Sequence, residues 1–68
     1  MKEKTWEVTM VRDYQEPNVE DWNEANIGFA QVCLDNELTY ADHAIQFETR
    51  WVEGNYEFTF SRRFKDRG

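Results

Sequence analysis

Residues 5–12, Thr-Trp-Glu-Val-Thr-Met-Val-Arg, alternate between two kinds of side chain along an extended backbone. Trp6, Val8 and Met10 fall on one side, whereas mainly polar and β-branched residues fall on the other. A period of two with many β-branched residues is typical of a strand that buries one face. This stretch therefore predicts an N-terminal strand with an apolar face, against which the rest of the domain packs.

A second stretch with the same period lies near the C-terminus. Tyr56, Phe58 and Phe60 alternate with polar residues, and the pattern continues into Arg62-Arg63-Phe64. We expect a strand here, and we expect residues 65–68, Lys-Asp-Arg-Gly, to form a frayed basic tail.

Residues 40–53 show the spacing of an amphipathic helix. The apolar positions recur at intervals of four, three and four: Tyr40, Ala44, Phe47 and Trp51. Thr39 and Asp42 have the spacing of a capping box, and Gly54-Asn55 supplies the residue types that end helices. The pattern predicts a helix over residues 40–53 whose apolar stripe packs on the sheet.

The stretch between Asp13 and residue 34 allows more than one interpretation. Pro17 ends the first strand, and Asn18 could cap a short helix over Val19–Ala25, although a loop with one helical turn fits equally well. Residues 27–34 predict a strand, but a single helix over residues 19–34 is the rival interpretation. Asn26 and Gly28 favour the strand because both residue types weaken helices.

Together these elements predict one α+β domain over residues 1–68, in the order β-(acidic loop or short helix)-β-α-β. Numbering the expected strands along the chain, the sheet is antiparallel with order 2-1-3 and packs on one helix. The other sheet face stays open. The last strand then lies at an edge, where Arg62 and Arg63 would discourage strand addition.

The charge of the chain is distributed unevenly along the sequence. Residues 13–49 contain nine carboxylates and no Lys or Arg, and the formal net charge of the whole chain is −6. A field of one sign repels phosphates and attracts basic surfaces. We therefore expect no direct binding to nucleic acid, and we expect the partner to be a basic surface of another protein.

Several classes of function find no support in the sequence. One Cys and one His provide neither an internal disulfide nor a structural zinc site. No set of nucleophile, base and orienting group can be assembled, and no phosphate-binding loop is present, so we expect neither an enzyme nor a cofactor. The absence of a leader or a long apolar run predicts a cytoplasmic protein that binds no membrane.

The acidic connection and its neighbours form the predicted partner-binding site. It comprises Tyr14, Glu16, Glu20, Asp21, Trp22, Glu24, Asp35 and Glu37. Carboxylates around aromatic residues suit an interface in which charge speeds association and aromatics hold the complex. In size and charge the chain is similar to the small antagonists with which phages and mobile elements block CRISPR effectors, restriction systems or polymerase.

This similarity predicts an inhibitor, for example an anti-CRISPR protein, that occludes a nucleic-acid-binding surface of its partner. The alternative is a structural module that forms a homodimer through the open sheet face, which we expect to carry Val11, Ala30, Val32 and Leu34.

Overall fold

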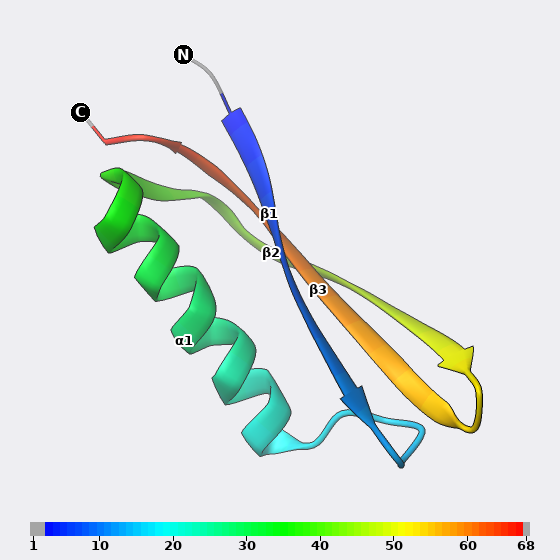
Figure 1. The fold of residues 1–68 in the computed structure, drawn as a ribbon. Helices are drawn as coiled ribbons and strands as arrows, with labels where there is room; N and C mark the ends of the chain where they lie inside the picture. The colour runs from blue at the N-terminus through cyan, green and yellow to red at the C-terminus, as the bar shows by residue number, and fades with distance from the viewer. Residues whose placement is uncertain (1–2, 68) are drawn as a thin grey trace.

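The computed structural model describes residues 3–67, which form one helix and three strands (Figure 1). The elements are β1 (Glu3–Arg12), α1 (Val19–Asn36), β2 (Leu38–Val52) and β3 (Asn55–Asp66). The strands make one antiparallel sheet in the order β1-β3-β2, and α1 runs along one side of it. The prediction of a small α+β domain with one helix and a three-stranded antiparallel sheet is confirmed.

The finer prediction of the chain order is wrong at two places. Residues 27–34, expected as a strand, belong to α1, and residues 40–53, expected as a helix, lie mostly in β2. The order is therefore β-α-β-β, and the predicted sheet order 2-1-3 is replaced by one in which the C-terminal strand lies in the middle. Arg62 and Arg63 consequently lie on the central strand and cannot protect an edge.

The helix α1 begins where the sequence predicted a cap and continues as the single helix of the rival interpretation. The Asn18 side chain accepts a hydrogen bond from the backbone N–H of Asp21, and the Asp21 carboxylate accepts one from the backbone N–H of Asn18. The buried residues of the helix follow one another at intervals of four: Asp21, Ala25 and Phe29. That spacing places them in one row facing the sheet, which is why the segment is helical.

An irregularity in β2 explains why this strand resembles a helix in the sequence. Tyr40 pairs with Phe64 and Ile45 pairs with Arg62, so residues 41–44 of β2 lie opposite Arg63 alone. This large bulge changes which residues share a face, and apolar residues on its two sides acquire the spacing of a helix. Beyond the bulge, residues 45–52 alternate regularly.

The hydrophobic core lies between α1 and the central strand. The largest fully buried side chains are Phe29, Phe58, Phe60 and Phe64. Met10 and Leu38 complete the core on β1 and β2, and Trp6 and Val8 pack against it. The predicted inward faces of β1 and β3 are thus confirmed.

The C-terminal residues have defined contacts where the sequence predicts a frayed tail. Lys65 and Asp66 belong to β3. The Arg67 backbone N–H donates to the Glu37 carbonyl at 3.3 Å, and its guanidinium donates to the Cys33 carbonyl at 3.2 Å. Gly68 lies outside the described residues.

Candidate functional site

Folding gathers the negative charge at one end of a molecule that is 44 Å long. We define the acidic end as residues 12–24 and 48–57, which meet where Arg12 pairs with Tyr56 and Tyr56 with Trp51. The carboxylates of the acidic end are Asp13, Glu16, Glu20, Asp21, Glu24, Glu48, Glu53 and Glu57. Its only bases are Arg12 and Arg50, which leaves a formal charge of −6, equal to that of the whole chain.

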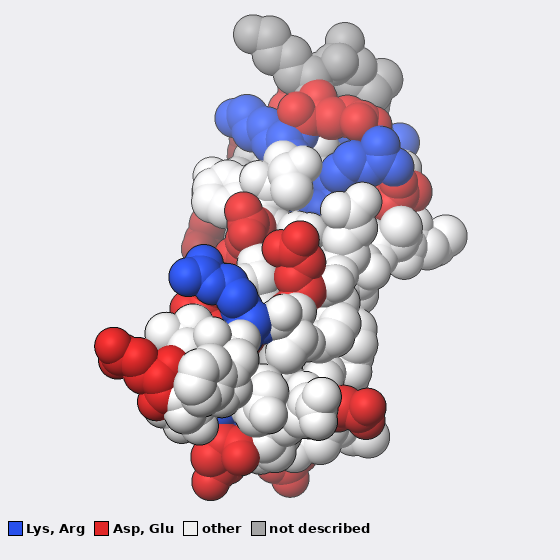
Figure 2. All heavy atoms as spheres, turned by 90° about the vertical axis from the view of Figure 1, so that its right-hand side faces the viewer, with Lys and Arg blue, Asp and Glu red and all other residues white. Residues whose placement is uncertain are grey.

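The open side of the sheet shows the same distribution in space. In Figure 2, much of the Lys and Arg surface lies in the upper part of the view, toward the chain termini. The lower end, where the β2–β3 turn and the β1–α1 loop lie, shows mainly carboxylates and uncharged residues. The other residues of the sequence carry equal numbers of acids and bases, so the molecule is electrically polarised along its length.

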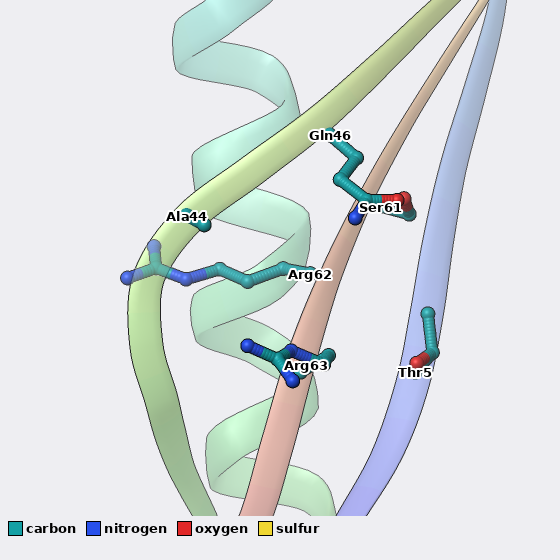
Figure 3. Close-up of a pocket in the computed structure, with 6 residues that line it drawn as sticks. All are labelled: Thr5, Ala44, Gln46, Ser61, Arg62 and Arg63. Carbon is teal, nitrogen blue, oxygen red and sulfur yellow. The ribbon is translucent and has the colours of Figure 1, made fainter.

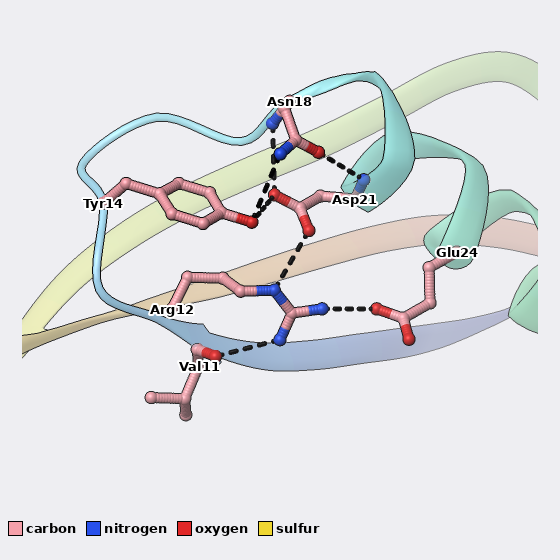
Figure 4. A network of polar contacts seen from close by, with 6 residues as sticks. All are labelled: Val11, Arg12, Tyr14, Asn18, Asp21 and Glu24. Atoms are coloured by element: carbon pink, nitrogen blue, oxygen red, sulfur yellow. Dashed lines mark hydrogen bonds and ion pairs between the residues drawn. The ribbon is translucent and has the colours of Figure 1, made fainter.

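A polar network closes the β1–α1 connection at the acidic end (Figure 4). The Asp21 carboxylate is 3% exposed and accepts hydrogen bonds from Tyr14 Oη at 2.6 Å, Arg12 Nε at 3.1 Å and the Asn18 backbone at 3.1 Å. Arg12 Nη2 also donates to Glu24 Oε2 at 2.8 Å. A buried carboxylate with three donors is a satisfied structural group.

The donors around Asp21 hold it in its charged form. The hydrogen bond from Tyr14, followed by the Asn18 backbone and Arg12, lowers the pKa of the Asp21 carboxyl. The same bond to Asp21, together with burial, raises the pKa of the Tyr14 hydroxyl. The two residues therefore stabilise the loop and the start of α1.

The aromatic residues of the predicted site also make internal contacts. Trp22 packs edge-on against Phe60 with ring centroids 4.7 Å apart, and it lies 5.7 Å from Phe47. Tyr14 lies 6.0 Å from Phe58. Both Tyr14 and Trp22 remain half-buried, so each presents only part of its ring to a partner.

The structure divides the predicted carboxylates into two groups. Glu16 and Glu20 are exposed near the start of α1, and Glu24 lies one turn further along. Asp35 and Glu37 lie at the other end of the helix, roughly 22 Å away at 1.5 Å per residue. Only the first group belongs to the acidic end.

Sequence reasoning missed an exposed aromatic at the acidic end. Trp51, expected in the core, is 64% exposed on β2, and Phe47 on the same face of the strand is 38% exposed. The alternation of residues 45–52 contained the signal for a strand, but the helical spacing across the bulge concealed it.

A small hollow lies beside the bulge of β2 (Figure 3). It has a volume of about 100 Å³ and is lined by Thr5, Ala44, Gln46, Ser61, Arg62 and Arg63. Both arginines are engaged: Arg62 lies 3.6 Å over the Tyr40 ring and donates to the Asp42 carbonyl, and Arg63 pairs with the Asp42 carboxylate. These contacts hold the bulge against β3, whereas the buried Nε of Arg62 makes no hydrogen bond within the described residues.

Comparison of the chain with protein-family models, curated proteins and solved structures finds no match. Within residues 3–67, no group of three or more His, Cys, Asp or Glu side chains is arranged to hold a metal ion. In the same residues, no helix has the length and apolar character needed to span a membrane.

Proposed function

We propose that this protein is a non-enzymatic binding domain that docks its acidic end on a basic surface of a partner protein. The observation that carries the proposal is that the acidic end bears a formal charge equal to that of the whole chain. A field concentrated at one end accelerates encounter with a positive surface and orients the domain as it approaches.

The exposed carboxylates near the start of α1 are the main contacts of the proposed interface. Glu16 and Glu20 are exposed, and Val19 between them is 74% exposed, which provides an apolar centre within an acidic rim. Interfaces commonly combine such a centre with a polar rim. The network around Asp21 supports this surface by holding the β1–α1 loop against the helix.

The consequence for the partner is occlusion. Basic protein surfaces often bind nucleic acid, and an acidic domain seated on one competes with the phosphates for the same cations. This mode of action suits phage and mobile-element antagonists of host defence, including anti-CRISPR proteins, and of host polymerase, in the host cytoplasm.

The test compares two triple variants with the same change in net charge. The first variant, Asp13→Asn, Glu16→Gln and Glu20→Gln, removes three negative charges from the acidic end. The control, Glu7→Gln, Asp35→Asn and Asp66→Asn, removes three from exposed carboxylates elsewhere. A partner is isolated from host lysate with the wild-type protein, and affinities are measured by calorimetry at low and high salt. We expect the first variant to lose at least tenfold in affinity and the control to lose little.

Competition with nucleic acid completes the test. Duplex DNA or RNA should displace the domain from its partner, and affinity should fall as salt rises. Equal effects of the two triple variants, or binding that salt does not change, would overturn the proposal.

A further inference from the structure

The second half of β2 is an exposed and regular sheet edge. In the order β1-β3-β2, one side of β2 has no neighbouring strand within the described chain. The bulge at residues 41–44 interrupts the first half, but residues 45–52 pair with β3 without interruption. Every residue from Gln46 to Asn55 is exposed. Edges of this kind pair with other strands unless charge, Pro or a bulge prevents it.

We propose that a second copy of this chain docks on this edge by antiparallel pairing of the two β2 strands about Thr49. The occupant is indicated by the side chains themselves. One face of the sheet holds Phe47, Thr49 and Trp51 of β2. The β3 residues with which they pair, Phe60, Phe58 and Tyr56, lie on the same face. Glu48 and Arg50 point to the opposite face, because side chains alternate along a strand.

The strand is complementary to itself in this register. With Thr49 opposite Thr49 of the second copy, Glu48 lies opposite Arg50 and Arg50 opposite Glu48. On the other face, Phe47 lies opposite Trp51, and the relationship repeats by symmetry. Opposite charges and aromatic pairs are the cross-strand combinations that stabilise antiparallel sheets. A two-fold symmetric interface requires this reciprocity.

Neighbouring registers lose the complementarity. Centring the pair on Glu48 places the two Glu48 carboxylates opposite each other, and centring it on Arg50 does the same with the two guanidinium groups. Like charges directly opposite destabilise a strand pair. The charges therefore select the register centred on Thr49, in which a six-stranded sheet runs through both copies with both helices on one side.

The aromatic residues at this edge gain the most from pairing. Trp51 is 64% exposed and Phe47 is 38% exposed, and Phe47 already packs on Trp22. Trp51 of the second copy would extend this aromatic row. Seven paired residues in each copy, 46–52, make a small interface compared with those of permanent dimers, so the dimer is reversible and depends on concentration.

A charge exchange tests the pairing directly. Sedimentation velocity over a concentration series measures the dimer for wild type, Glu48→Arg, Arg50→Glu and the double exchange. Each single variant places like charges opposite each other and should weaken the dimer roughly tenfold. The double variant restores opposite charges with the wild-type net charge, and it should restore the dimer. Glu7→Arg, on β1, makes the same charge change as Glu48→Arg and should have a much smaller effect.

Cross-linking provides a second measurement that does not depend on the charge variants. In a Cys33→Ala background, Thr49→Cys should form an intermolecular disulfide under mild oxidation, because opposite residues in an antiparallel pair lie within disulfide reach. Thr9→Cys on the other edge strand should not. A monomer at high concentration, a dimer that Glu48→Arg leaves intact, or a double exchange that restores nothing would overturn the inference. Cross-linking through Thr9→Cys instead would assign the dimer to the β1 edge and would also overturn the inference.

Discussion

A Cβ atom at Gly28 would lie 3.0 Å from Cγ2 of Val8, a contact so tight that the Val8 side chain would have to shift by a few tenths of an ångström. Gly28 lies in the middle of α1, and Val8 lies on β1 against the core. The missing side chain therefore allows the helix backbone to approach the strand closely. The same glycine that weakens the helix locally permits its packing on the sheet.

Replacing Gly28 with Ala should produce two opposing effects. Ala favours the helix by about 1 kcal/mol relative to Gly, but the new methyl group meets Val8. We expect Gly28→Ala to be neutral or destabilising in the wild type and to stabilise the Val8→Ala variant relative to its parent. Urea unfolding of the four proteins measures the coupling. Ala30→Gly, at an exposed position of α1, calibrates the propensity effect, and equal effects of Gly28→Ala in both backgrounds would contradict the packing argument.

The cap of α1 should contribute measurably to stability. The Asn18 side chain accepts a hydrogen bond from the Asp21 backbone at 2.9 Å. Asn18→Ala removes this acceptor and should cost about 1 kcal/mol, which lowers the melting temperature by roughly 4–8 °C in a domain of this size. Asn18→Asp keeps the acceptor and serves as the matched control in thermal unfolding. A melting temperature unchanged by Asn18→Ala would show that the cap adds nothing.

Stability should fall in acid, in part through Asp21. Its pKa is lowered in the folded state from 3.8, first by the hydrogen bond from Tyr14. A carboxyl with a lowered folded pKa stabilises the protein above its unfolded pKa, and this contribution disappears as the pH falls below about 3.8 toward the folded value. The pKa of Asp42 is lowered as well, through the backbone N–H of Ala44 and the Arg63 guanidinium, so it adds to the loss.

Two variants isolate the contribution of Asp21. Asp21→Asn should be less stable than wild type at pH 7, and its stability should decrease less steeply between pH 5 and pH 2.5. Tyr14→Phe removes the largest cause of the shift while keeping the carboxylate, so it should also flatten the profile. Urea unfolding across this pH range provides the measurement, and profiles parallel to the wild type would refute the role of the network.

The sequence predicted secondary structure correctly where the hydrophobic residues follow a single period. The alternation of residues 5–12 and 56–61 predicted β1 and the core of β3, because nothing competes with a period of two there. Asn18 correctly predicted the start of the helix, because a cap depends only on residues close to it in the sequence.

The errors arose where tertiary contacts outweigh local preference. Gly28 favoured a strand over a helix in the sequence. In the structure its missing side chain permits a close contact between α1 and Val8, which the sequence does not display. The bulge at residues 41–44 joins two stretches of strand out of phase, and four apolar residues across it acquire helical spacing. This error moved Trp51 from an exposed edge to a predicted core, and together with the misassignment of residues 27–34 it changed the sheet order.

The acidic character of the site was accessible from the sequence, but its extent was not. The count of carboxylates in residues 13–49 identified the charged region, whereas Glu53 and Glu57 join it only because the β2–β3 turn lies at the same end as the β1–α1 loop. Asp21 is buried and not exposed, because Arg12 from β1 and Tyr14 from the loop both donate hydrogen bonds to it.

The turn between β2 and β3 provides the last prediction, because two consecutive residues have positive φ. Glu53 has φ 49° and Gly54 has φ 89°, as in the two-residue type I′ turns that match the twist of a hairpin. Gly54→Ala places a side chain in a conformation that favours glycine and should cost about 1 kcal/mol. Glu53→Asn supplies the preferred Asn-Gly pair and should raise the melting temperature. Thermal unfolding distinguishes the two, and a Gly54→Ala protein as stable as the wild type would show that the turn adopts another geometry.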